Sequence, residues 1–189
     1  MPLPRIIEPK NAVDAFKAFV RTNRVGRGDV IFLDSPGGLT MAGMALGSAI
    51  REARLSTTVA AFDRDGVKSN GKCTSACVFA FLGGVDRKVA SGAQLGVHQM
   101  TVYGGAQMSA ADAQYFTSLI CKHVAKMGGT IGVITAALGT PPQSMHIFSR
   151  AELIRNDLVT PDIVQSRVQV DAPAFVLASS TDIATRLGL

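Results

Sequence analysis

Two short apolar runs, each leading into a helix pattern, organise the hydrophobic and polar positions of the chain. Residues 29–34, DVIFLD, precede an apolar stripe of helical spacing over residues 39–55. Residues 57–63, TTVAAFD, precede a polar stretch and then the apolar helix pattern of residues 76–82. Short continuous apolar runs bounded by turn residues indicate strands buried on both faces of a largely parallel sheet. The repeated order of strand, turn and helix predicts an α/β fold with right-handed crossovers.

The 3.6-residue periodicity predicts further helices. Ser109 is placed to cap one of them, and Ser149 with Glu152 forms a capping box at the start of another. Gly128 follows the helix that Ser109 begins, at a position where helices commonly end. The predicted ranges are 10–23, 109–127, 131–138, 149–157 and 181–187.

Other short apolar segments predict strands, and one polar stretch predicts a loop. Residues 64–72, RDGVKSNGK, are rich in charged, small and turn-forming residues, so we expect an exposed loop there. The predicted strands cover residues 87–90, 95–100, 158–159, 168–170 and 174–178. We find no internal repeat and no low-complexity tract.

Length and composition predict one compact domain over residues 1–189. A chain of this length with 47% hydrophobic residues can bury one well-packed core but is short for two. The 19 glycines and the low charged fraction of 17% favour a tightly wound fold with close backbone contacts. They argue against a helical bundle or a disordered tail.

Charge and hydropathy argue against a nucleic-acid partner and against a membrane span. The net charge is +5, yet lysines and arginines are scattered, and Arg21, Arg24 and Arg27 are more typical of a solvated helix end than of a nucleic-acid site. No apolar run approaches the roughly 20 residues of a membrane span. The first ten residues, MPLPRIIEPK, lack the apolar core of a signal peptide. We therefore expect a soluble protein, cytoplasmic as given, that binds no nucleic acid.

The three cysteines predict no metal site, because no suitably spaced second cysteine or histidine pair accompanies them. Cys73 and Cys77 allow two interpretations. They pair as a disulfide in an oxidising compartment, or they are two small buried apolar residues. Their spacing within a continuous helix would strain the Cα separation that a disulfide requires, and both interpretations stay open.

Ser75 is a candidate nucleophile, because it lies where the chain enters the helix pattern of residues 76–82. Backbone N–H groups at a helix start have no intrahelical acceptor, so they can stabilise an oxyanion beside a nucleophile. In the alternative interpretation, Ser75 only caps the helix. His98 lies among apolar residues, where a histidine is either a hydrogen-bonded core residue or a catalytic base.

The turn Ser35-Pro36-Gly37-Gly38 links a predicted strand to a predicted helix. Such a turn can cradle a phosphate, but neither G-x-G-x-x-G nor G-x-x-x-x-G-K-[ST] is present. The turn can equally supply half of an oxyanion hole, or it can be a purely structural tight turn. We predict no cofactor.

Three short motifs follow one another along the chain: SPGG at 35–38, CTSAC at 73–77 and GVHQM at 96–100. Together they resemble the proteolytic subunit of the Clp protease and its ClpP-like relatives in the ClpP/crotonase superfamily. SRAELIRNDLVT, residues 149–160, is similar to the segment that closes that domain, so the resemblance covers about residues 30–160. It implies a fold of stacked ββα units. The similarity is closer to bacterial ClpP-like proteins predicted to be periplasmic, which share C-x-S-A-C, F-L-G-G-V-x-R and L-G-V-H.

The resemblance implies a serine peptidase or related acyl hydrolase that acts on a peptide or protein. Ser75 would be the nucleophile, His98 the general base, and the N–H groups of Gly38 and Ala76 the oxyanion hole. The family uses an aspartate to orient the histidine, whereas Met145 aligns there and cannot accept the hydrogen bond. The other acceptors left open are backbone carbonyls and the carboxylates of Asp112, Asp157 and Asp162.

Two alternatives to a peptidase remain: a catalytically degenerate ClpP-like domain used for assembly or peptide binding, and a crotonase-type enzyme acting on an acyl-CoA. We also expect a homo-oligomer, because Tyr115 and Phe116 give the helix over 109–127 more apolar surface than one core-facing stripe needs. The matching helix of the Clp subunit packs between subunits. The periplasmic relatives carry a leader, so the periplasm is the alternative compartment if this chain is a leaderless or truncated form.

Overall fold

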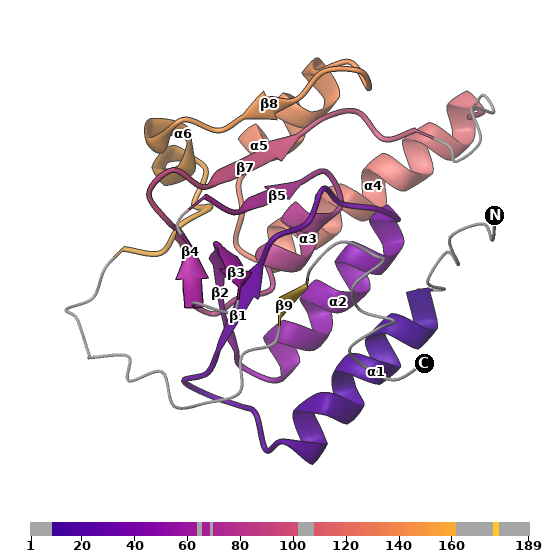
Figure 1. Ribbon diagram of the computed structural model, residues 1–189. Helices are drawn as coiled ribbons and strands as arrows, with labels where there is room; N and C mark the ends of the chain where they lie inside the picture. The colour runs from indigo at the N-terminus through magenta and orange to yellow at the C-terminus, as the bar shows by residue number, and fades with distance from the viewer. Residues whose placement is uncertain (1–8, 64–65, 69, 102–107, 162–175, 178–189) are drawn as a thin grey trace, which may run out of the picture.

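A four-stranded parallel sheet and a three-stranded mixed sheet form the framework of the molecule (Figure 1). The computed structural model describes residues 9–63, 66–68, 70–101, 108–161 and 176–177, with side chains over 13–61, 66, 70–101 and 108–161. The parallel sheet has the strand order β6-β2-β1-β9. Its strands are β1 (Val30–Leu33), β2 (Ser56–Val59), β6 (Arg87–Val89) and β9 (Val176–Leu177).

The mixed sheet has the order β5-β7-β8, in which β5 pairs parallel with β7, and β7 pairs antiparallel with β8. A separate antiparallel hairpin joins β3 and β4. These strands are β3 (Ala61–Asp63), β4 (Gly66–Lys68), β5 (Lys72–Thr74), β7 (Gln94–Val97) and β8 (His146–Ile147).

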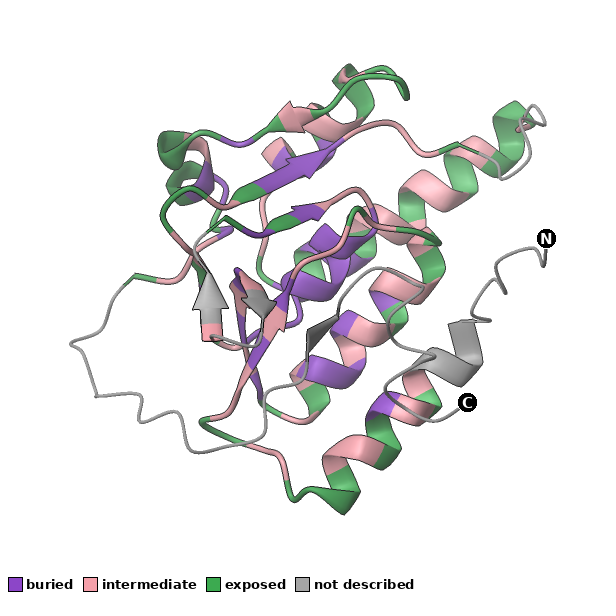
Figure 2. Cartoon of the chain, viewed as in Figure 1, coloured by how far each residue is buried: buried purple, intermediate pink, exposed green. Residues whose placement is uncertain are grey.

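Six helices belong to the described part of the chain, and they surround one shared core. α1 packs against α2, and α2 packs against the short α3, whose residues are all buried (Figure 2). α4 packs against α5. The helices are α1 (Pro9–Thr22), α2 (Thr40–Glu52), α3 (Cys77–Phe81), α4 (Ala110–Lys126), α5 (Ile131–Gly139) and α6 (Arg150–Arg155).

The contact between α2 and α3 is close enough to fix the start of α3. A Cβ at Gly43 would overlap the carbonyl of Ala76, and one at Gly47 would overlap the carbonyl of Phe79. Because neither glycine has a side chain, the two helix backbones meet directly. Ile50, Val78 and Phe81 are fully buried around this contact. The position of Ser75, just before α3, is therefore set by core packing.

Two arginines, Arg51, which is half-buried, and Arg87, which is buried, connect the carboxyl ends of three helices. Arg51 donates to the carbonyls of Leu82, Gly83 and Gly84 after α3, at 2.8–3.0 Å. Helix ends leave such carbonyls without intrahelical donors and with partial negative charge. Burial lowers the pKa of Arg51, but a guanidinium stays protonated in proteins. Its charge is therefore stabilised by carbonyl dipoles.

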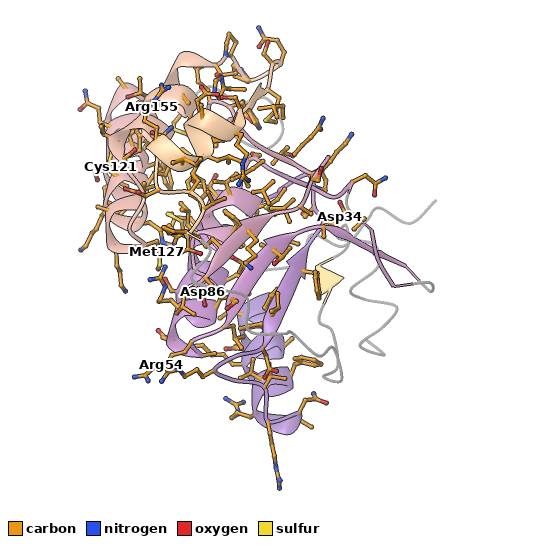
Figure 3. The ribbon with its side chains drawn as sticks, turned by 90° about the vertical axis from the view of Figure 1, so that its left-hand side faces the viewer. Asp34, Arg54, Asp86, Cys121, Met127 and Arg155 are labelled. Atoms are coloured by element: carbon orange, nitrogen blue, oxygen red, sulfur yellow. A yellow bond between two sulfur atoms is a disulfide. The ribbon has the colours of Figure 1, made fainter. Side chains whose placement is uncertain are left out.

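Arg87 extends this arrangement to α4 and α6. Its side chain is 6% exposed and donates to the carbonyls of Asp157 at 2.7 Å and Leu158 at 3.2 Å, after α6. Both arginines also donate to the carbonyl of Met127, after α4. Figure 3 labels Met127 and, close by, Asp86 in this region. Burial is the main cause that lowers the pKa of Arg87, and the neighbouring charge of Arg51 lowers it further.

The structure confirms the α/β class and most predicted elements. The Ser109 side chain caps α4, and the capping box of Ser149 and Glu152 begins α6. β9 lies within the strand predicted over 174–178. The strand predicted over 168–170 and the helix over 181–187 lie outside the described residues. That residues 1–189 form a single domain stays a prediction.

Several local predictions were wrong. The strand predicted over 57–63 is interrupted at Ala60, and the loop predicted over 64–72 contains β4 and the start of β5. The polarity of the stretch concealed β4, which pairs antiparallel with β3 so that Gly66 lies opposite Asp63. Residues 158–159 form no strand, because the N–H of Leu158 donates to the carbonyl of Leu153 in α6 and its carbonyl accepts from Arg87. β8 was missed since two residues are too few to show a period.

Candidate active site

Ser75 lies in a sharp turn between β5 and α3, and its backbone is in the left-handed region with a φ of 55°. This conformation is uncommon for a residue with a Cβ and persists only where the surroundings enforce it. Here the Ser75 N–H donates to the carbonyl of Gly96 at 2.8 Å, and the Ser75 carbonyl accepts from the N–H of Val78 at 3.1 Å. A strained strand-to-helix turn of this kind presents the nucleophilic serine in α/β-hydrolases.

The turn at Ser35–Gly38 is hydrogen-bonded to β5, which leads to Ser75. Ser35 forms an isolated parallel bridge with Cys73. Asp34, labelled in Figure 3, accepts the N–H of Lys72 at 2.8 Å through Oδ1. The Thr74 hydroxyl donates to the carbonyl of Pro36 at 3.0 Å. These bonds align the turn that follows β1 along β5, from Lys72 to Thr74, so the glycines of the turn reach the start of α3.

Gly37 makes the closest approach of this turn to Ser75. With a φ of 108°, a Cβ on Gly37 would lie 2.8 Å from the Cβ of Ser75 and 3.1 Å from the backbone nitrogen of Ala76. Only glycine fits this position. Among the described residues, the N–H groups of Gly38 and Ala76 donate no hydrogen bond. Ala76 is 3% exposed and neither residue lines the pocket around Ser75, so their role as oxyanion donors stays a prediction.

Ser75 and His98 line the same pocket, which has a volume of about 210 Å³. Ser75 comes from the junction of β5 and α3, and His98 follows the last residue of β7. Gln99 holds this end of the strand against α5, because its side chain donates to the Leu138 carbonyl at 2.6 Å. The lining is mostly apolar and comprises Thr40, Ser75, Phe79, Val97, His98, Gln99, Met100, Met108, Ala113, Thr117, Ile120, Ile134, Ala137 and Leu138.

His98 has no orienting partner among the residues that the structure describes. Its Nδ1 is buried and makes no hydrogen bond there. β7 and β8 pair Val97 with His146, and this antiparallel register, continued by one residue, sets His98 opposite Met145. Asp112 instead receives a hydrogen bond from Ser109, and Asp162 lies outside the described residues. The register thus sets Met145, a side chain without a carboxylate, opposite His98, and the third catalytic residue stays unassigned.

Cys73 and Cys77 form a disulfide, with their Cα atoms 5.2 Å apart. The helical spacing that argued against this bond does not apply, because Cys73 lies in β5 and only Cys77 is in α3. Sequence periodicity missed β5, since it is three residues long. Cys121, labelled on α4 in Figure 3, is a free thiol.

His123 connects α4 to the helix that follows Ser75. Its Nε2 lies 3.0 Å from the carbonyl of Phe79, which can only accept, so Nε2 carries the proton. Burial lowers the pKa of His123, as does the nearby charge of Lys126. The apolar spacing of the sequence gave no indication of this contact, because the helical periodicity shows only which face is buried.

Neither a metal-binding cluster nor a membrane-spanning helix occurs in the described ranges. They hold no group of three or more histidine, cysteine, aspartate or glutamate residues arranged to bind a metal ion. The helices described are all too short or too polar to cross a bilayer.

The structure is similar to solved structures of ClpP-like proteases. A variant of ClpP1 from Listeria monocytogenes matches with a TM-score of 0.54 and 17% identity, over 81% of this chain and 84% of that chain. A variant of the membrane-bound stomatin-specific protease 1510-N matches with a TM-score of 0.52 and 14% identity, over 81% of this chain and 72% of that chain. No protein-family model and no curated protein matches the sequence. The fold is thus ClpP-like, as the sequence resemblance implied.

Proposed function

We propose that this protein is a ClpP-like serine peptidase, or a related acyl hydrolase, with Ser75 as nucleophile and His98 as general base. One observation carries the proposal: Ser75, in a left-handed turn between strand and helix, lines the same pocket as His98. A serine that only capped a helix would not require a positive φ, because N-cap residues adopt extended dihedral angles.

The chemistry follows from these positions. His98 accepts the hydroxyl proton as the Ser75 Oγ attacks the substrate carbonyl, and the imidazolium then protonates the leaving amine or alcohol. The N–H groups of Gly38 and Ala76 stabilise the tetrahedral oxyanion, and such donors contribute about 2.7–4 kcal/mol each. Water, activated by the same imidazole, then hydrolyses the acyl-enzyme.

The pocket favours an apolar side chain of a peptide as its occupant. Its volume of about 210 Å³ is below the roughly 300–1,000 Å³ of pockets that enclose a whole small molecule. Phe79, Ile120 and Ile134 contribute apolar walls, and no carboxylate or ammonium group lines the pocket within the described residues. These features support peptide cleavage after an apolar residue over catalysis on an acyl-CoA.

The second candidate is a ClpP-like domain that binds peptides without cleaving them. It is favoured by the buried Nδ1 of His98, which has no partner in the described part of the chain. In serine proteases, losing the orienting aspartate lowers kcat by about 10⁴-fold. Residual turnover at that level would still distinguish a slow enzyme from a binding domain.

The proposal also includes a homo-oligomeric state and an oxidising compartment. Tyr115, on α4, is 61% exposed and makes a ring contact with Phe116, which supports a homo-oligomeric interface along this helix. The disulfide supports an oxidising compartment, where such bonds persist. The periplasm therefore fits better than the cytoplasm.

Hydrolysis of short peptide esters tests the proposal. We expect wild-type protein to cleave esters of an apolar residue at least about tenfold faster than esters of aspartate, because the pocket has apolar walls. Ser75→Ala should abolish hydrolysis without loss of fold. Ser118→Ala, at an exposed position on α4, is the matched control and should retain full activity. Equal residual rates in wild type and Ser75→Ala would leave the binding domain as the better account.

A further inference from the structure

The disulfide closes a ring around Ser75. Between Cys73 and Cys77 lie only Thr74, Ser75 and Ala76, and the Cα atoms of the two cysteines are 5.2 Å apart. An extended chain would separate them by about 13 Å. The backbone therefore reverses within three residues, and the middle residue has a φ of 55°.

Both ends of the ring are anchored in different parts of the core. Cys73 is fully buried in β5, where it pairs with Leu95 of β7 and bridges to Ser35. Cys77 is 6% exposed and is the first residue of α3. The disulfide thus bonds the strand before Ser75 directly to the helix after it.

The other contacts near Ser75 are non-covalent. The Ser75 N–H donates to the carbonyl of Gly96, the Ser75 carbonyl accepts from the N–H of Val78, and the Thr74 hydroxyl donates to Pro36 at an exposed position. The left-handed region is disfavoured for any residue with a Cβ. Core packing sets where α3 begins, while the disulfide limits φ at Ser75 itself. Without the covalent link, the backbone at Ser75 would relax more readily toward negative φ, which would move the Oγ within the pocket.

We infer that the Cys73–Cys77 disulfide is a positioning element for Ser75, and that reducing it lowers the reactivity of this serine; the inference rests on the proposed function. A dithiol reductant supplies two electrons and two protons, so the cystine becomes two thiols and the reductant becomes a disulfide. Since both cysteines are buried, reduction proceeds through transient opening of the turn. The same bond therefore makes the site sensitive to the redox state of its compartment.

Hydrogen exchange and serine labelling test this inference separately. Hydrogen exchange and labelling are measured on two proteins. One carries only Cys121→Ala, which removes the free thiol and keeps the disulfide, and the other carries Cys73→Ala/Cys77→Ala in addition. In the double variant, the Ser75 amide should exchange at least about tenfold faster. A fluorophosphonate should label Ser75 at least about tenfold more slowly, because small misplacements of reacting groups are costly. The pH dependence of labelling should keep its shape, since His98 is unchanged.

Phe16→Leu is the stability control, because Phe16 is buried on α1, which packs against α2. It should lower the melting temperature without changing either readout. If the double variant does not fold, the disulfide-intact protein is instead treated with a small dithiol below its melting temperature, with the same readouts.

Unchanged exchange at Ser75 overturns the inference, and so does faster exchange with unchanged labelling. If the disulfide-intact protein is never labelled, the proposed function fails, and exchange alone then decides whether the disulfide positions Ser75.

Discussion

Gly37 approaches Ser75 so closely that a Cβ on Gly37 would lie 2.8 Å from the Cβ of Ser75. The two residues come from turns 38 positions apart, each of which follows a strand and precedes a helix. The bridge between Ser35 and Cys73 brings these turns together. The candidate oxyanion donors and the candidate nucleophile thus belong to one small backbone assembly.

Gly37→Ala should damage this assembly more than it damages the fold. The new methyl group would displace Thr74 or Ser75, so we expect serine labelling to fall by about 100-fold. The control is Gly28→Ala, because Gly28 also has a left-handed φ, of 99°, but a Cβ added there would meet no atom within 4 Å. Both variants should lose about 1–3 kcal/mol of stability from backbone strain. An equal loss of labelling in both would refute the specific contact.

Met145→Asp should raise activity by supplying the missing orienter of His98. Residues directly opposite in an antiparallel pair have Cβ atoms about 4.5–5.5 Å apart, so a carboxylate there can reach the imidazole. We expect an increase in hydrolysis of at least about tenfold, a fraction of the roughly 10⁴-fold that the orienter contributes in serine proteases.

Ile147→Asp is the matched control for this change, because Ile147 is 39% exposed, Met145 is 37% exposed, and Ile147 pairs with Gly96. It should not raise the rate. A rate that stays level or falls in Met145→Asp would show that the acceptor, if there is one, lies elsewhere.

His123 should make folding stability depend on pH. Its pKa is lowered in the folded protein, mainly by burial, so folding favours the neutral ring. The resulting stability is present above the unfolded histidine pKa of about 6.5 and is lost as pH falls through the lower folded value. Urea unfolding should therefore show lower stability at pH 5.5 than at pH 7.5.

His123→Gln keeps an N–H donor toward Phe79 but cannot titrate, so much of this pH dependence should disappear. An unchanged difference between the two pH values would mean that other groups cause it.

The proposed oligomer should depend on the exposed face of α4. Light scattering at micromolar concentration should give a mass several times the 19.8 kDa of one chain. Tyr115→Lys should shift the protein toward monomer, since it introduces a charge where an apolar ring is 61% exposed. Ile154→Lys, at a side chain 58% exposed on α6, is the control and should not change the mass. A monomeric wild type would contradict the oligomer.

Local pattern was enough to predict the strand-turn-helix order and the caps at Ser109 and Ser149, whereas the ClpP-like fold was implied by the family resemblance. The resemblance also singled out Ser75 and His98, which the structure brings to one pocket, although their catalytic roles stay predictions. The disulfide could not be decided, because it depends on β5, a strand of three residues. The arginine contacts at helix ends were missed because they join carbonyls far apart in sequence. Such long-range hydrogen bonds produce no periodic pattern of residues in the sequence.

Fluorophosphonate labelling, mapped by mass spectrometry, tests whether Ser75 and His98 act together as nucleophile and base. We expect one covalent adduct on the peptide that contains Ser75 in the wild type, because only an activated serine reacts at an appreciable rate. Labelling should be absent in Ser75→Ala and at least about 100-fold slower in His98→Ala, since the general base is lost. No adduct on Ser75, or an equal labelling rate with and without His98, would contradict the claim that these two residues form a working nucleophile and base.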